Sequence, residues 1–260
     1  MANMTSSVSA SQVAGELASA TFEEIPALVE HYREDPRQQV IKACERALKR
    51  HAKELAERER VNGMYELMHE LGGDGVVVGV DEVGRGSVAG PLTVCAVCLP
   101  MEPRVWGIND SKKLTPKKRD ILFDAIREQA SAWAVAWVDA GEIDETDILS
   151  ARMKAMQLAI DRLAKAADFA LIDGNRDKGK RAAITTPHRT IVQGDGRSAS
   201  IAAASILAKV SRDRWMEEAA KTYPQYEFER HKGYGTKRHY ELLLRYGPSP
   251  IHRRTFLKRL

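Results

Sequence analysis

The chain has 260 residues, of which 43% are hydrophobic and 29% charged, and it carries a formal net charge of +4. This composition supports a buried core and argues against wholesale disorder. No apolar run approaches the roughly 20 residues of a membrane span, and the N-terminus lacks the basic start and apolar stretch of a secretory signal. Without such a run we expect no membrane association. Three cysteines do not make a disulfide framework, so we expect a reducing, cytoplasmic location.

The first part of the chain predicts a tail followed by helices. Residues 1–20 are rich in Ser and Ala and show no hydrophobic period, so we expect a mobile tail. Residues 21–73 predict a helical N-terminal extension, with one helix beginning near Thr21 and a second, longer one opening at Asp35-Pro36. A further short helix is expected over Met64 to Leu71, closed by a Gly-Gly pair.

The pattern changes at residue 74, and residues 74–260 predict one α/β domain. Short apolar runs that indicate strands precede and then alternate with amphipathic runs that indicate helices. The strand candidates are "GVVVGVD", "PLTVCAVCLP", "AWAVAWVDA", "FALIDG" and "TIVQGD". This order favours a mixed sheet flanked by helices, completed by a basic helical part from about residue 215 to the end.

Cys95 and Cys98 have the spacing of a redox or zinc pair. They lie in a predicted strand, however, where residues three apart point to opposite faces. No second pair follows at zinc spacing. We therefore interpret both as small core residues.

Charge is unevenly distributed along the chain. From Arg230 to Leu260 there are nine Lys or Arg residues against Glu241 alone, a balance of +8 that leaves −4 for the remainder. A basic end on a slightly acidic body is typical of a protein whose one face meets a polyanion. A solvated basic helix face is the alternative.

Acidic residues follow several predicted strands. Asp81 and Glu82 close the first strand, Asp173 the fourth, and Asp195 the fifth. Functional groups gather where the strands of an α/β sheet end, and converging carboxylates repel one another unless a cation intervenes. Oxygen-only ligands suit Mg²⁺ or Mn²⁺ better than zinc. The alternative for each acid taken singly is a turn cap.

Asp81 and Glu82 present a geometric difficulty. Consecutive residues of a regular strand face opposite ways, so both side chains reach one site only if the strand breaks or bulges. Otherwise Glu82 takes part through its backbone carbonyl. The acidic run from Glu142 to Asp147 has a simpler interpretation, since it precedes a predicted helix and is expected to cap it.

Several motifs together resemble those of bacterial ribonuclease HII, the type 2 ribonuclease H. They are "GVDEVGRGSVAGPL", "DSKKLTPKKR", "LIDGN", "GDGRSASIAAASILAKVSRDR", "HKGYGTKRH" and "YGPSPIHRRTF". The resemblance implies a ribonuclease H-like mixed sheet and Mg²⁺- or Mn²⁺-dependent hydrolysis of RNA in RNA–DNA hybrids and at single ribonucleotides in duplex DNA. It implies cutting 5′ of the ribonucleotide, which leaves 3′-hydroxyl and 5′-phosphate ends.

The resemblance also implies roles for individual residues. Asp81, Glu82, Asp173 and Asp195 match the family's catalytic, metal-binding acids. Gly84, Arg85 and Gly86 match the loop that contacts the 2′-hydroxyl at the RNA–DNA junction, and Tyr234 the tyrosine that stacks on the following deoxyribose. Ser111, Lys112, Lys113 and Lys209 match positions expected at phosphates.

Other interpretations remain open at this point. A ribonuclease HIII-type enzyme usually carries Gly-Thr-Gly in place of Gly-Arg-Gly, and a non-catalytic nucleic-acid-binding module would explain the basic end but not the acids. We expect a monomer. His231 and His239 are expected at the surface or beside phosphates, and His252 in a structural or phosphate-side role.

Overall fold

The computed structural model describes residues 8–258. The chain divides into two compact units, the first ending at Arg60 and the second beginning at Val61. The boundary falls inside a long helix, α3 (Gln38–Gly72).

The first unit contains α1 (Ala10–Ser19), α2 (Ile25–His31) and the beginning of α3. The predicted mobile tail over residues 1–20 is therefore wrong for its second half, while residues 1–7 lie outside the described part. Ser9 and Gln12 form a reciprocal capping box that starts α1. Val13 and Leu17, one helical turn apart, are fully buried against the unit's apolar cluster, and this burial holds α1 in place.

Helix α3 runs unbroken to Gly72, so the separate helix predicted over Met64 to Leu71 is wrong. No proline interrupts the sequence in between, and an interior glycine weakens a helix without ending it. Gly73, with a φ of +71°, ends the helix in the left-handed conformation. Met64, Tyr65 and Met68 from the last turns lie in the core of the second unit.

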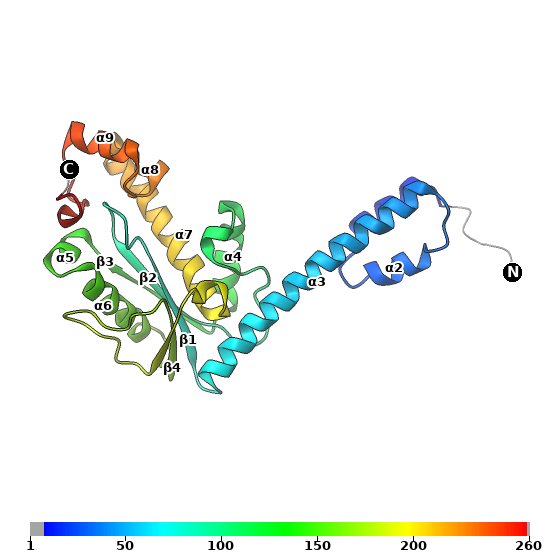
Figure 1. The fold of residues 1–260 in the computed structure, drawn as a ribbon, viewed down its shortest axis with the longest axis horizontal. Coiled ribbons are helices and arrows are strands. Elements are labelled where there is room, and N and C mark those ends of the chain that lie inside the picture. Colours follow the sequence, from blue (N-terminus) through cyan, green and yellow to red (C-terminus); the bar gives the residue numbers. More distant parts are fainter. Residues whose placement is uncertain (1–7, 259–260) are drawn as a thin grey trace. The chain divides into compact units, whose positions relative to one another are not determined.

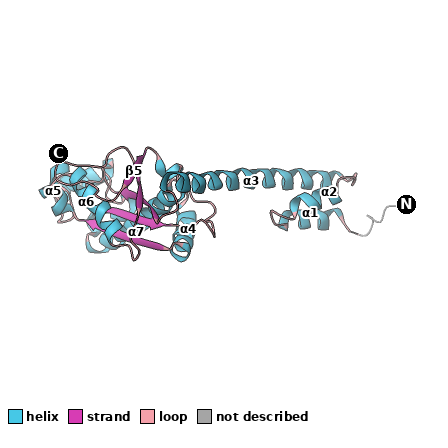
Figure 2. Cartoon of the chain, turned by 90° about the horizontal axis from the view of Figure 1, so that it is seen from below, coloured by secondary structure: helices cyan, strands magenta, loops and turns pink. Residues whose placement is uncertain are grey.

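The second unit is built on a five-stranded mixed sheet of order β3-β2-β1-β4-β5 (Figures 1 and 2). The strands are β1 (Val77–Val83), β2 (Leu92–Cys98), β3 (Ala132–Val138), β4 (Phe169–Asp173) and β5 (His188–Ile191). β1 pairs antiparallel with β2 and parallel with β4. The predicted mixed α/β sheet flanked by helices is confirmed.

One face of the sheet packs against α7 (Ala199–Thr222), α4 (Pro116–Gln129) and the end of α3. The long helix α7 lies across β1 (Figure 1). Gly79 in β1 allows this close approach, because a Cβ there would lie 2.1 Å from the backbone of Ser200. Cys95 also faces this side and is buried.

The opposite face packs against α6 (Ile148–Asp161), which follows the short helix α5 (Ala140–Glu145). Val78, Val80 and Cys98 point to this side. Cys95 and Cys98 thus lie on opposite faces as free thiols, and their interpretation as core residues is confirmed.

The C-terminal part forms a separate apolar cluster around the second half of α7. Its elements are η3 (Pro224–Tyr226), α8 (Phe228–His231), α9 (Lys237–Tyr246) and η4 (Arg254–Phe256). Tyr226, Phe228 and Leu242 are buried there together with Val88 and Ala89 from the loop after β1. Among residues 8–258, no helix is long and apolar enough to cross a membrane.

Candidate active site

Asp81 and Asp173 come together on the face of the sheet that packs against α7. In β1 and β4 the pairing reaches Val80 and Ile172, so one further step in the same register brings Asp81 beside Asp173. Alternation along each strand turns both side chains to the α7 side. Asp81 is buried, and its carboxylate accepts the backbone N–H of Glu82 at 2.7 Å and lies beside Ser205 of α7.

Glu82 points to the other face of the sheet. β1 continues regularly to Val83, opposite Thr93 in β2, so the predicted break or bulge is absent. The Glu82 side chain reaches α6, where its Oε1 lies 2.9 Å from Nε of the buried Arg152. Its Oε2 is buried and has no hydrogen-bond partner among residues 8–258. A carboxylate oxygen that is desolvated without a partner is costly, which marks this atom as one that a ligand would satisfy.

Asp195 reaches the same region from a tight turn. β5 ends at Ile191, earlier than predicted, and Gln193 adopts a left-handed φ of 55° before η2 (Gly194–Gly196). The Asp173 Oδ1 accepts the backbone N–H of Gly194 at 2.7 Å and that of Asp195 at 3.4 Å. Asp173 therefore fixes the turn that presents Asp195, and α7 begins directly after it.

The acids perturb one another. Burial raises the pKa of Asp81 well above its usual range, and the negative charges of Glu82 and Asp173 raise it further. Burial likewise raises the pKa of Asp195 to about 6, helped by Asp173 and Asp110. Like charges that are desolvated together and shift each other's pKa values are characteristic of functional sites.

Two cations offset part of this negative charge. Arg152 pairs with Glu82, and Lys112 Nζ lies 3.8 Å from Asp195 Oδ2 and 3.9 Å from Asp110 Oδ1. Burial would lower the pKa of Lys112, but the surrounding carboxylates, Asp110 and Asp195 first, raise it overall. The Lys112 side chain is 80% exposed, so it can leave Asp195 when another cation arrives.

The donor set fits a hard divalent ion in its chemistry. All the groups are carboxylates, one oxygen is buried without a partner, and two aspartates have raised pKa values. Within residues 8–258, no group of three or more His, Cys, Asp or Glu side chains is arranged to hold a metal as it stands. Glu82 faces Arg152 and Asp173 accepts backbone N–H groups, so binding would require these side chains to turn.

A cavity of about 350 Å³ opens beside Asp81 and Glu82. Ser111, Lys112, Lys209 and Tyr234, all predicted at the substrate, contribute to its lining. Lys113 is not part of this lining and is exposed. Four residues predicted for substrate binding thus lie around the same hollow as two of the predicted acids.

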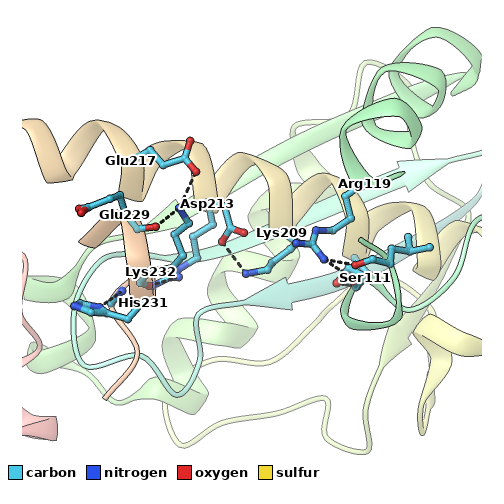
Figure 3. A network of polar contacts seen from close by, with 12 residues as sticks. Ser111, Arg119, Lys209, Asp213, Glu217, Glu229, His231 and Lys232 are labelled. Atoms are coloured by element: carbon cyan, nitrogen blue, oxygen red, sulfur yellow. Dashed lines mark hydrogen bonds and ion pairs between the residues drawn. The ribbon is translucent and has the colours of Figure 1, made fainter. Parts of the chain in front are cut away.

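The cationic side of this cavity is held by a polar network (Figure 3). Lys209 Nζ pairs with Asp213 one turn along α7 at 2.7 Å. Arg119 donates to the carbonyl of Ser111 at 2.9 Å, while Ser205 donates to the Ser111 hydroxyl at 3.0 Å. Ser111 is buried by these contacts, so its part is to fix the turn that carries Lys112.

The loop of Gly84, Arg85 and Gly86 rests on two buried arginines. Gly84 has a φ of +85°, and a Cβ there would lie 2.2 Å from Nε of Arg212. Arg212 donates to the carbonyls of Ala89, Pro91 and Lys232. Arg253 donates to the carbonyls of Arg85 and Gly90. Arg85 and Gly86 themselves are exposed.

Some residues lie elsewhere than predicted. His231 and His239 are buried, as is His252, so a surface position for the first two is wrong. Their rings stack in the apolar cluster of the C-terminal part. The acidic run near α6 is structural as predicted, with Asp147 capping that helix and Asp144 accepting N–H groups of Arg254 and Thr255.

Sequence reasoning missed the partners of the predicted residues. Arg152 and Arg253 bind acids or carbonyls that no sequence spacing connects to them. Ser205 and Arg212 lie within the quoted motif "GDGRSASIAAASILAKVSRDR". Their seven-residue separation, two turns of a helix, was the one available signal that both face the site.

The mixed sheet with acids where β1 and β4 end defines a nuclease of the ribonuclease H-like class. The fold is similar to that of "ribonuclease H2" from Pyrococcus horikoshii OT3, with a TM-score of 0.58 and 28% identity over 69% of this chain and 92% of that one. It is also similar to the RNase HII of Archaeoglobus fulgidus, solved in complex with PCNA, with a TM-score of 0.59 and 27% identity over 68% and 93% of the chains. An RNase HIII in complex with Mn²⁺ shares the fold at 20% identity and a TM-score of 0.52, over 68% and 71%.

Sequence similarity places the chain within this class. The family model "Ribonuclease HII" matches residues 78–259, and "Ribonuclease HII N-terminal domain" matches residues 9–71. Ribonuclease HII of Bacillus velezensis is 44% identical over 85% of this chain and 86% of its own length, and that of Enterococcus faecalis 45% over 86% and 87%. The chain belongs to the ribonuclease HII family, whose members are metal-dependent ribonuclease H endonucleases acting on RNA–DNA hybrids.

Proposed function

We propose that the chain hydrolyses RNA in hybrids and at single ribonucleotides in duplex DNA, cutting 5′ of the ribonucleotide to leave 3′-hydroxyl and 5′-phosphate ends. Asp81, Glu82, Asp173 and Asp195 would hold two Mg²⁺ or Mn²⁺ ions. The observation that carries this proposal is the contact of Asp173 with the turn of Asp195, on the face where Asp81 lies beside it. When bound, the ions would supply activation of the attacking water and stabilisation of the leaving oxygen.

Glu82 takes part through its carbonyl or after its side chain turns. Its carboxylate lies on the α6 face with Arg152, away from Asp81. Its backbone, by contrast, is next to Asp81 and lines the same cavity. The buried, unpaired Oε2 supports a side chain that turns once a cation arrives, and both routes keep Glu82 at the site.

Junction recognition would come from the loop of Gly84 to Gly86 and from Tyr234. The 2′-hydroxyl distinguishes RNA from DNA at a given position, and Gly84, which packs closely on Arg212, directly follows Val83 in the cavity lining. Tyr234 lies at the same cavity with 37% of its surface exposed, so its ring is free to stack on a sugar.

Lys112, Lys113 and Lys209 would bind phosphates. Ser111 would fix the turn that carries Lys112 and Lys113. Such contacts position a duplex without reading its sequence. Lys112 lies next to Asp195 and Lys209 next to the cavity, so the phosphate being cut and its neighbours would meet them together. We propose that the chain acts as a monomer.

The chain consists of an N-terminal extension and a catalytic domain. The sequence predicts a helical extension over residues 21–73; because α1 packs in the same apolar cluster, we propose that the extension also includes α1, and that residues 74–260 form the catalytic domain, with a basic helical part from about residue 215. The family models for the two parts, which match residues 9–71 and 78–259, support this division. The free cysteines support a reducing, cytoplasmic location.

The proposal is tested with a DNA duplex that carries one ribonucleotide, incubated with Mg²⁺ or Mn²⁺. We expect a single cut 5′ of the ribonucleotide and none in the all-DNA duplex. Asp81→Asn should abolish cutting, whereas Asp120→Asn, which alters an exposed ion pair with Arg214, should not. Full activity of the Asp81 variant would overturn the assignment of the acids, and cutting of all-DNA duplex would overturn the substrate.

A further inference from the structure

Three histidines lie buried beneath the substrate cavity. His231 ends α8, His239 lies in α9, and His252 follows the end of α9. The His231 and His239 rings stack with centroids 4.1 Å apart, and Nε2 of His239 lies 3.0 Å from Nε2 of His252. In the described part of the chain, no hydrogen bond or ion pair joins their rings to the four acids or to Lys112 and Lys209, so the site described above does not explain why polar rings are buried here.

The backbone around the rings fixes the proton positions. Ser249 donates its N–H to Nδ1 of His252 at 2.9 Å, so that nitrogen is an acceptor and the proton lies on Nε2. His239 contacts the carbonyl of Tyr234 through Nδ1 at 2.9 Å, and a carbonyl only accepts, so Nδ1 carries the proton. His252 Nε2–H then donates to His239 Nε2. All three bonds are satisfied by one pair of neutral tautomers.

The proton of the His231 ring is placed by its hydrogen-bond partners in the same way. Its Nε2–H donates to the carbonyl of Tyr226 at 2.8 Å, and its Nδ1 accepts the N–H of Gly233 at 3.3 Å. Burial lowers the pKa of His239 and of His252 to about 4, and that of His231 also falls. The rings therefore act as fixed hydrogen-bonding groups at neutral pH.

This chain of bonds ends on the backbone of Tyr234. The carbonyl of Tyr234 accepts from His239, and its N–H donates to the carbonyl of His231 at 2.9 Å. The imidazole of His239 and the backbone carbonyl of His231 thus bind the two peptide groups of Tyr234, whose carbonyl also accepts the N–H of Thr236 at 2.8 Å, while its side chain lines the cavity.

The same segment is joined to the loop after β1. The carbonyl of Gly233 accepts the N–H groups of Val88 and Ala89 at 2.9 and 3.1 Å, and Arg212 donates to the carbonyl of Lys232 at 2.8 Å. A shift of the histidine cluster would therefore displace Tyr234 relative to the loop that begins at Gly84.

We propose that His231, His239 and His252 are positioning residues that hold the backbone of Tyr234, and so set the preference for single ribonucleotides over long hybrids. The inference rests on the proposed role of Tyr234 at the junction. A long hybrid offers many sites that are cut without one particular junction, so loss of this positioning affects the single ribonucleotide most.

Two substitutions of His239 separate its two hydrogen bonds. His239→Asn places an amide N–H near the position of Nδ1 and keeps the bond to Tyr234, whereas His239→Gln reaches the position of Nε2 and keeps only the bond to His252. We expect His239→Gln to lower kcat/KM on the single-ribonucleotide duplex about tenfold, the effect of one lost buried hydrogen bond. Its kcat/KM on a long hybrid should change by less than about threefold, and His239→Asn should preserve the wild-type preference between the two substrates.

Tyr234→Ala is the reference for the proposed function. If it leaves the ratio of the two kcat/KM values unchanged, the junction role of Tyr234 fails. If it lowers the ratio while His239→Gln does not, only the histidine inference is overturned. Equal losses on both substrates for the Asn and Gln variants would show a purely structural role and would also overturn it.

A second measurement on the wild-type protein does not depend on a variant that folds. Imidazole ¹⁵N NMR at neutral pH should show His239 protonated at Nδ1 and His252 at Nε2, both neutral. The opposite tautomers, or a charged ring at either position, would contradict the hydrogen-bonded chain to Tyr234.

Discussion

Replacing Asp195 by Asn should make the metal-free protein more stable while it removes activity. The pKa of Asp195 rises from 3.8 to about 6 in the folded chain because of burial and of the charges of Asp173 and Asp110. An acid with a raised folded pKa stabilises the fold below its unfolded pKa, and this contribution is lost as the pH rises through the folded pKa. A shift of this size corresponds to about 2–3 kcal/mol of destabilisation at pH 8, which Asn, neutral at every pH, would not suffer.

The assay is thermal and urea unfolding in EDTA at pH 5 and pH 8. For a domain of this size, each kcal/mol moves the midpoint by about 2–4 °C, so the Asp195→Asn midpoint should exceed that of the wild type by about 4–12 °C at pH 8. The gap should narrow at pH 5. Saturating Mg²⁺ should then stabilise the wild type, by about 2.7 kcal/mol at a hundredfold excess over Kd, and stabilise the variant less.

Asp120→Asn serves as the matched control. Its carboxylate forms an exposed pair with Arg214, with side chains 57% and 51% exposed, and such pairs contribute less than about 1 kcal/mol. A variant of Asp195 that is less stable than wild type in EDTA at pH 8, or one with the same pH dependence as the wild type, would refute the view that the acids repel one another in the empty site.

Three further changes test other parts of the structure. Gly84→Ala should cost about 1–2 kcal/mol or more, because its φ is +85° and its Cβ would meet a buried guanidinium, whereas Gly86→Ala has open space and should leave the unfolding midpoint unchanged. Arg152→Met leaves the Glu82 carboxylate buried without its cation and should cost about 3–5 kcal/mol in urea unfolding. Adding Glu82→Gln should recover part of this free energy. If the free-energy losses of the two substitutions simply add in the double variant, the pairing is contradicted. Leu17→Ala should lose about 2–5 kcal/mol of packing in the first unit and speed hydrogen exchange across α1, with unchanged exchange counting against a packed helix.

The sheet and the placement of two acids were predictable because strand alternation is strict. A period of two puts Asp81 and Glu82 on opposite faces, and β1 obeys it to its last residue. The sequence indicated that the strand breaks or bulges at this point, or that Glu82 takes part through its backbone carbonyl. In the structure the strand stays regular, and Arg152 on α6 stabilises the side chain that points away.

The buried arginines could not be predicted in the same way. Arg212 and Arg253 bind backbone carbonyls of the loop after β1, and carbonyl acceptors carry no residue identity for a sequence pattern to reveal. Arg253 also lies in the stretch from Arg230 to Leu260, where positive charge suggested contact with a polyanion. Arg253 is fully buried, so part of the basic character of this region supports the fold and is not available to nucleic acid.

The helix α1 was missed because its signal is short. Val13 and Leu17 are a single apolar pair in a segment of small residues, and one pair does not establish a period. The sequence also contains the capping pair of Ser9 and Gln12, but a helix of this length is only marginally stable by itself. Packing against Val40 and its neighbours in α3, a long-range contact, decides the outcome.

Helix α7 links the proposed reaction site with the proposed recognition site. It begins just after the turn of Asp195, passes Asp81 with Ser205, reaches the cavity with Lys209, and supports the loop of Gly84 with Arg212. These side chains project from one stiff helix, so the distances between them change only when a side chain changes its rotamer. The distance between the proposed metal ligands and the loop proposed to contact the sugar is therefore set by one element, which would let the proposed cut fall at a constant offset from the ribonucleotide.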